Sequence, residues 1–197
     1  MPNDWCDSNG LGTYAFLRAD TACAARAVYQ IWNRIVTFKQ GQLRVNLLLN
    51  RVSPWADIDS YVPYQGRVVI KIKQPAELWV RVPEWVAPEN VEANVNNSAS
   101  ELTIDRRYVG IGAVKAGDEV VVEFPISERT DVAVFRMGIL EQTHSLVRKG
   151  NDVVAIFPRG RYYPYYRREH YRQNEPRWWN VTRFRTSHQG VASIGNP

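Results

Sequence analysis

The stretch Gly66–Lys73, with the sequence GRVVIKIK, carries the residue pattern that decides the fold of this chain. Its apolar residues Val68, Ile70 and Ile72 fall on one face, opposite Arg67, Lys71 and Lys73 on the other. A period of two residues is typical of a β-strand with one buried face. The stretch therefore predicts a strand that turns one side toward an apolar core and the other toward water.

The same alternation recurs along most of the chain. Short segments of this kind, separated by turn residues, are typical of an antiparallel sandwich. We expect strands over residues 43–49, 67–73, 77–83, 101–104, 108–114, 119–124 and 144–157, the last divided by a turn at Gly150-Asn151, with a further turn over Lys115–Asp118. The predicted fold class is therefore mainly β, an antiparallel β-sandwich of jelly-roll-like character.

One segment has helical periodicity instead. Residues 22–38, ACAARAVYQIWNRIVTF, follow a candidate N-cap at Asp20 or Thr21. Apolar residues fall on one face at Val28, Ile31, Trp32, Ile35 and Val36, and we expect Gly41 to end the helix. We place a domain boundary near residues 39–41, with a helical part at 1–40 and a β region at 41–197. A single amphipathic helix needs a partner for its apolar face, either the sheet or a helical domain of which it is one part.

Composition sets broad limits on the class of protein. The chain has 197 residues, a net charge of +5 and two cysteines, too few for a disulfide framework. No apolar run is long enough to predict a membrane span. The first ten residues lack the basic and apolar regions of a signal peptide, although an incomplete N-terminus would hide one, so the compartment stays open.

Catalytic patterns are sparse when the residues are read on their own. His144, His170 and His188 are scattered, with no cysteine or carboxylate at metal-ligand spacing, and we expect a hydrogen-bonded surface role for His170. Asp57 and Asp59 would face the same way on an extended segment. We interpret that segment as a loop in which the carboxylates accept hydrogen bonds from the backbone, because glycosidase carboxylate pairs usually come from separate elements.

Several longer motifs carry a resemblance to a known family. They are VNLLLNR at 45–51, SPWADIDSY at 53–61, PYQGRV at 63–68, VRVPEWV at 80–86, VKAGDEVVVEFPISERT at 114–130, SLVRKGNDVV at 145–154 and YYRREHYRQNEPRWWNVTRF at 165–184. Together they resemble the region after the catalytic barrel in the β-L-arabinofuranosidase-like glycoside hydrolases, family 127 and its relatives. The resemblance covers residues 26–185.

The resemblance implies an (α/α)6 barrel followed by β-sandwich domains. Family members are retaining glycosidases that remove terminal β-L-arabinofuranose with a zinc-bound cysteine nucleophile and a glutamate acid/base. It implies zinc as the family cofactor, arabinose-containing glycans as partners of the full-length enzyme, and no membrane. We expect this chain to be the C-terminal sandwich portion with one barrel helix, inactive alone and without bound zinc, because the rest of the barrel lies upstream of Met1 in the family. We also expect self-association through the face that the missing barrel would cover.

The family pattern Cys-Cys-x-Gly-Asn-Gly-x-Arg-Ala-x-Tyr is only partly matched. Aligned on Arg26 to Tyr29, the cysteine pair falls at Ala19-Asp20, and Cys23 stands at the Asn position. In a second alignment, on residues 5–10, Cys6 is the second, nucleophilic cysteine and Trp5 replaces the first. In a third alignment, Asp4 and Cys6 stand at the positions of the Glu-x-Cys zinc ligands. Cys6 is thus the candidate nucleophile, and Cys6 and Cys23 are the candidate zinc ligands. From the residues alone, without the family pattern, we favour a structural role for both Cys6 and Cys23.

The stretch 160–185, GRYYPYYRREHYRQNEPRWWNVTRFR, alternates arginines with aromatic rings. Three interpretations stay open. We favour structural packing, in which guanidinium groups stack on Tyr and Trp faces. A carbohydrate-facing surface would use Tyr165, Arg168 and Trp178. A nucleic-acid surface fits the composition, but no recognised nucleic-acid-binding motif accompanies it.

Overall fold

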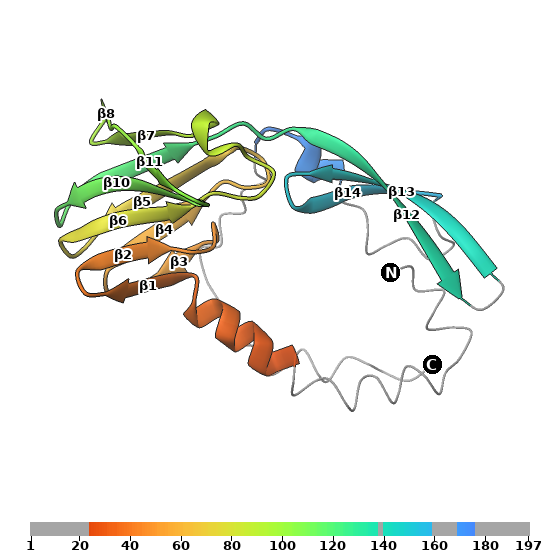
Figure 1. The fold of residues 1–197 in the computed structure, drawn as a ribbon, viewed down its shortest axis with the longest axis horizontal. Helices are drawn as coiled ribbons and strands as arrows, with labels where there is room; N and C mark the ends of the chain where they lie inside the picture. Colours follow the sequence, from red (N-terminus) through yellow and green to blue (C-terminus); the bar gives the residue numbers. More distant parts are fainter. Residues whose placement is uncertain (1–23, 138–139, 159–168, 176–197) are drawn as a thin grey trace, which may run out of the picture.

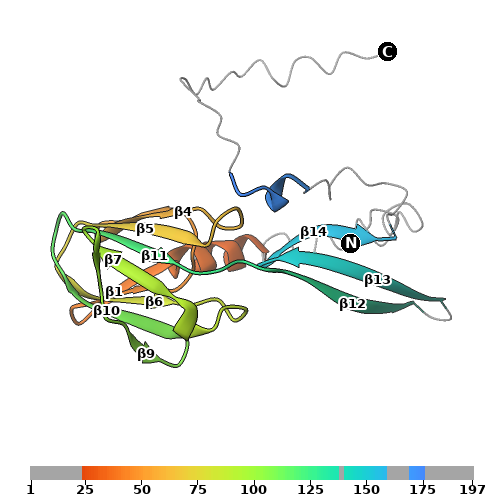
Figure 2. The ribbon, with the colours of Figure 1, turned by 90° about the horizontal axis from the view of Figure 1, so that it is seen from above.

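In the computed structural model, residues 24–137, 140–158 and 169–175 are described. Two sheets lie face to face and form the layers of a β-sandwich, as Figures 1 and 2 show. The five-stranded sheet has the order β1 (Val36–Lys39), β2 (Gln42–Val45), β6 (Ala76–Arg81), β10 (Tyr108–Val114) and β9 (Thr103–Asp105). The six-stranded sheet has the order β3 (Arg51–Val52), β4 (Ala56–Ser60), β5 (Arg67–Ile72), β11 (Glu119–Glu123), β7 (Glu92–Val95) and β8 (Ser98–Ala99).

The apolar side chains that alternate along these strands fill the space between the sheets. The most deeply buried of them are branched aliphatic residues, including Leu43, Ile58, Ile70, Leu78 and Val109. The predicted inward residues of β5 are all buried, and its basic residues point outward. Burial of such apolar surface, at about 25 cal/mol per Å2, is the main force that holds the two layers together. The predicted β-sandwich is confirmed.

The sandwich is not purely antiparallel, which corrects one part of the prediction. β2 pairs with β6 in parallel, with Leu43 opposite Leu78 and Val45 opposite Val80. The chain between these strands first crosses to the other sheet and forms β3, β4 and β5. It returns in the same direction, so the two neighbours run parallel. Alternation of apolar residues reports which face of a strand is buried but not the direction of its neighbour.

The helix is shorter than predicted. It covers residues 24–33 in the described part of the chain, and the prediction that it continues to Gly41 is wrong. Ile35 and Val36 are buried in the sandwich core, and β1 pairs with β2 through a turn at Gln40 and Gly41, which both have positive φ. The predicted domain boundary near residues 39–41 therefore falls in a hairpin turn. β-branched Val and Thr fit a strand as well as an apolar helical face, which is why the pattern was ambiguous.

The helix itself presents its apolar side chains to solvent. Val28 is 66% exposed, Ile31 51% and Trp32 47%. In Figure 1 the helix leads away from the sandwich at the start of β1. Trp32 of the helix contacts the sandwich through Arg51 of β3, whose guanidinium carbon lies 3.3 Å from the centre of the Trp32 ring. No helix in the described residues is long and apolar enough to span a membrane.

Other strand boundaries also differ from prediction. The first predicted strand ends at Val45, and Leu47 and Leu48 pack against the core from an irregular segment. The predicted strands that became β5, β6, β9, β10, β11, β13 and β14 are confirmed, as is the turn at Lys115–Asp118, where the Asp118 carboxylate accepts a hydrogen bond from the Lys115 amide at 2.7 Å. β1, β3, β4, β7, β8 and β12 were not predicted.

A third sheet lies beside the sandwich and was not predicted as a separate unit. It has three antiparallel strands in the order β12 (Glu128–Met137), β13 (Leu140–Lys149) and β14 (Asp152–Phe157). The chain passes directly from β11 into β12, and Figure 1 shows the third sheet extending away from the sandwich. A short 3-10 helix, η3 (Glu169–Arg172), lies beside β14.

Candidate functional site

All the site residues predicted from the sequence lie outside the described residues. These are the candidate nucleophile Cys6, the candidate zinc ligands Cys6 and Cys23, and the carbohydrate-facing Tyr165, Arg168 and Trp178. The roles assigned to them therefore stay predictions. Within residues 24–137, 140–158 and 169–175, no three His, Cys, Asp or Glu side chains come together as a metal ion would require.

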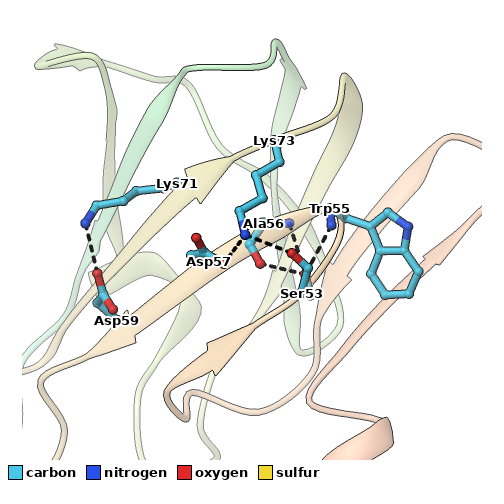
Figure 3. Close-up of polar contacts among 7 residues, drawn as sticks. All are labelled: Ser53, Trp55, Ala56, Asp57, Asp59, Lys71 and Lys73. Carbon is cyan, nitrogen blue, oxygen red and sulfur yellow. Dashed lines mark hydrogen bonds and ion pairs between the residues drawn. The ribbon is translucent and has the colours of Figure 1, made fainter.

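The motif at 53–61 forms a charged outer face of the sandwich, shown in Figure 3. Asp57 and Asp59 lie on β4 and not in a loop, so that prediction is wrong. They do point to the same side, as an extended segment requires. Lys73 on the chain after β5 donates to Asp57 at 2.5 Å, and Lys71 on β5 donates to Asp59 at 3.1 Å. Each carboxylate is therefore paired with a lysine on the outer face of one sheet. The carboxylates of a glycosidase stand instead on the two sides of a scissile bond.

Ser53 fixes the start of this motif. Its buried hydroxyl donates to the Ala56 carbonyl at 2.6 Å and accepts from the amides of Ala56 at 3.0 Å and Trp55 at 3.3 Å. The Lys73 ammonium also donates to the Ser53 carbonyl at 3.0 Å. These bonds turn the chain into β4 and satisfy buried polar atoms. In these contacts the motif at 53–61 stabilises the start of β4.

The most elaborate polar site lies where the third sheet meets the sandwich. We call it the junction, formed by Tyr64, Lys149, Arg172, Gln173 and Asn174. Lys149, at the end of β13, is only 5% exposed, and its ammonium donates to four oxygen atoms. Three are main-chain carbonyls, of Tyr64 at 3.1 Å, Arg172 at 3.3 Å and Gln173 at 3.0 Å, and the fourth is the Asn174 side-chain oxygen at 3.3 Å.

The ammonium at the junction joins three segments that are far apart in the sequence. Tyr64 belongs to the loop before β5, Lys149 ends β13, and the other three residues lie at and after η3. Burial lowers the pKa of Lys149, and the nearby Glu128 carboxylate opposes this shift. A buried ammonium is tolerated when its donors are satisfied by fixed dipoles, and four oxygens meet that requirement here.

An ion pair and side-chain contacts reinforce the junction. Arg172 donates through Nε and Nη2 to the two oxygens of Glu128, at 2.7 and 2.6 Å. These hydrogen bonds from Arg172 hold the pKa of Glu128 below its ordinary value. Tyr64 and Tyr171 pack edge to face with ring centres 5.5 Å apart, and Gln65 donates to the Asn174 carbonyl at 2.9 Å.

The turn between β13 and β14 makes a second contact with the sandwich. The indole nitrogen of Trp85 donates to the side-chain oxygen of Asn151 at 3.0 Å. Gly150 has φ of +60°, and a Cβ added there would lie 2.9 Å from Trp85 Cζ2. Trp85 also packs edge to face on Phe124 of the sandwich, with ring centres 5.8 Å apart.

The junction contains part of the arginine-rich stretch 160–185 and therefore tests how that part is used. Of its residues, 169–175 are described, and the only arginine among these seven is Arg172, which pairs with Glu128. His170 lies against Tyr171 with ring centres 4.2 Å apart. In this short part, the contacts agree with the structural-packing interpretation. No sequence pattern indicated Lys149 or Glu128, since lone charged residues on a strand look like ordinary surface positions.

Comparison with known proteins agrees with the fold that the resemblance implied. The structure is similar to part of a solved protein described as a glycoside hydrolase, with 16% identity, a TM-score of 0.54, and coverage of 70% of this chain and 25% of that one. This likeness shows the fold of a portion of a glycoside hydrolase. The chain spans about a quarter of the length of the structures it matches.

Two further solved structures are similar at lower TM-scores. One is Ara127N-Se, a GH127 β-L-arabinofuranosidase from Geobacillus stearothermophilus T6, with 18% identity, a TM-score of 0.48, and coverage of 66% of this chain and 22% of that one. The other is the GH127 β-arabinofuranosidase BT3674, with 21% identity, a TM-score of 0.42, and coverage of 60% and 23%. No protein-family profile and no curated protein matches the chain by sequence.

Proposed function

We propose that this chain is the β-sandwich portion of a β-L-arabinofuranosidase-like glycoside hydrolase and that it supports a helical catalytic domain without cleaving glycans by itself. The observation that carries the proposal is the fold likeness that covers 70% of this chain but 25% of a solved glycoside hydrolase. The ordered motifs at 45–51, 53–61 and 80–86 support the same family. A sandwich of this kind would act by holding the catalytic domain in shape.

The helix over residues 24–33 supports a packing role. Its apolar side chains Val28, Ile31 and Trp32 face solvent in the described structure. Exposed apolar surface of this kind marks a contact surface. In the proposed enzyme, further helices of the catalytic domain would cover it.

Hydrolysis in the complete enzyme would then use the chemistry that the family resemblance implies. A zinc ion would keep a cysteine thiol ionised, and the thiolate would be the nucleophile toward a terminal β-L-arabinofuranose residue. Cys6 is our candidate for the thiol, and Cys6 and Cys23 are our candidate zinc ligands. Arabinose-containing glycans are the proposed partners of the complete enzyme.

Two assays test the proposal. The 197-residue chain, supplied with zinc, should not release the chromophore from an aryl β-L-arabinofuranoside, and turnover that depends on zinc would contradict the proposed inactivity. A chimaera in which residues 24–197 replace the equivalent sandwich of a known β-L-arabinofuranosidase should hydrolyse the same substrate. A folded chimaera without activity would argue against the supporting role, with the unmodified enzyme as the control.

A further inference from the structure

A polar hollow of about 320 Å3 lies at one end of the six-stranded sheet, beside the junction. It is lined by residues at the start of β5, the start of β7 and the end of β11. Its charged members are Arg67, Glu92 and Glu123, and the amides of Gln65 and Asn90 also line it. The volume lies at the lower end of the roughly 300–1,000 Å3 of small-molecule sites.

The three charges form a row across adjacent strands. Glu123 of β11 is paired directly with Arg67 of β5 on one side and with Glu92 of β7 on the other. Directly opposed residues share a face of the sheet, and like charges in that position are destabilising. The Arg67 guanidinium is paired with Glu123, and Glu92 adds a second carboxylate on the far side of Glu123.

The guanidinium also has unused donor capacity. Arg67 Nε lies 3.9 Å from the nearer Glu123 oxygen, which is an ion pair but too long for a hydrogen bond. This nitrogen is shielded from solvent and has no hydrogen-bond partner among the described residues. The Nε atoms of Arg51 and Arg107 are in the same state, so a ligand would reach Arg67 through the exposed part of its side chain and not through this shielded atom.

The floor of the hollow is rigid. A Cβ added to Gly66 would lie 1.8 Å from the Phe124 carbonyl oxygen, so the two backbones can approach this closely only at a glycine. The Phe124 amide donates to the Gly66 carbonyl at 2.8 Å, and the Phe124 ring is held by Trp85. Arg67 is also positioned over the Tyr61 ring, with its guanidinium carbon 5.3 Å from the ring centre. The backbone of the hollow and the Arg67 guanidinium are therefore held in place before any ligand arrives.

We propose that this hollow is a non-catalytic binding site for a neutral sugar, held through adjacent hydroxyl groups. A hydroxyl both donates and accepts, so it can donate to Glu92 or Glu123 while it accepts from Arg67. Hydrogen bonds to charged partners are the stronger kind. Two adjacent hydroxyls could donate one to each carboxylate. An anionic ligand would meet two carboxylates, and a divalent cation would meet the Arg67 guanidinium.

The test uses the 197-residue chain and saturation-transfer NMR with L-arabinose, D-xylose and D-galactose as separate probes. We expect saturable binding of at least one sugar in the millimolar range. Glu92→Gln and Glu123→Gln should each weaken that binding at least fivefold. Glu119→Gln is the matched control, because it makes the same charge change on β11 and does not line the hollow.

Several outcomes would overturn the proposal. One is no binding of any of the three sugars by the wild-type chain; another is equal weakening by all three substitutions. Binding of Ca2+ that depends on Glu92 and excludes the sugars would assign the hollow to a cation instead. A thermal unfolding curve for each variant shows whether it is folded, and both Glu92 and Glu123 are exposed, so we expect both variants to fold. The arabinofuranosidase chimaera should keep its activity with Glu92→Gln, so this site and the proposed function can fail independently.

Discussion

The ammonium of Lys149 and the main-chain carbonyl oxygen of Gln173 lie 3.0 Å apart, and this contact joins the end of β13 to the segment after η3. Tyr64 of the sandwich accepts from the same ammonium. One buried positive charge therefore holds a strand of the third sheet, the segment after it and the sandwich together. This arrangement makes the junction sensitive to a single substitution.

Lys149→Ala should lower the free energy of unfolding by about 1.5–3 kcal/mol, because it removes hydrogen bonds from a charged donor and leaves buried carbonyls without partners. Urea unfolding at neutral pH measures this loss. Lys71→Ala, which removes the partner of Asp59 at an exposed position, should cost clearly less, because exposed ion pairs contribute little to stability. Equal losses in the two variants would mean that the junction does not depend on the buried ammonium.

The space left by Lys149→Ala also allows a rescue experiment. Propylammonium chloride carries the same charged group, so it should raise the melting temperature of this variant more than sodium chloride at the same concentration. The wild-type chain should respond equally to the two salts. No difference between the salts in the variant would indicate that the junction collapses when the side chain is shortened.

Gly150→Ala should destabilise the chain more than Gly41→Ala. Both glycines have positive φ, so both substitutions carry backbone strain of about 1–2 kcal/mol. Only at Gly150 would the added Cβ collide with a side chain, that of Trp85, whereas nothing lies within 4 Å at Gly41. The additional loss at Gly150 should be about 1–3 kcal/mol, as for other overpacked sites. Thermal unfolding of both variants measures the difference, which should vanish in a Trp85→Ala background.

Stability should depend on pH through Glu128. Hydrogen bonds from Arg172 hold the pKa of Glu128 below its ordinary value of 4.5. The ion pair therefore contributes its full stabilisation above pH 4.5, and the contribution is lost as the pH falls through the lower pKa of the folded state. Glu128→Gln should be less stable than wild type by about 0.5–1 kcal/mol at neutral pH, given that both side chains are partly exposed. Urea unfolding at several pH values should show this difference shrinking below pH 4.5; a constant difference would contradict the assignment.

Ser53→Ala should destabilise the sandwich by about 1–3 kcal/mol, because two backbone amides and a carbonyl at the start of β4 lose their buried partner. Ser60→Ala at the other end of β4 is the matched control, since the Ser60 hydroxyl accepts one hydrogen bond, from Val62 at 3.4 Å. Chemical denaturation ranks the two variants. A larger loss at Ser60 would show that Ser53 does not organise the motif.

We propose that the chain self-associates through the exposed face of the helix over residues 24–33. The double substitution Ile31→Ser with Trp32→Ser should raise the dissociation constant at least tenfold, because it removes apolar area from that face. Val132→Ser with Val134→Ser is the control, since these two exposed residues lie on β12 of the third sheet. Sedimentation velocity at several concentrations measures association. An effect of the control alone would place the contact on the third sheet.

The sequence predicted the strands that are rich in Val and Ile, such as β5, β11 and β14. Strand propensity and burial agree in these segments, so no other information was needed. It failed at β1, where Ile35 and Val36 also fit a helical face, and at β4, where polar residues suggested a loop. In both cases pairing with a neighbouring strand decided the structure, and that neighbour is defined only in three dimensions.

By itself, the sequence determined the sandwich class and the position of its apolar faces, because a side-chain period of two fixes which residues are buried together. It also carried the family motifs, since these are ordered strings of residues. Only the tertiary structure decided the parallel pairing of β2 with β6, the buried position of Lys149 and the row formed by Arg67, Glu123 and Glu92. These features depend on segments that are distant in the chain and meet only when the strands take their register, and no local pattern of residues specifies that register.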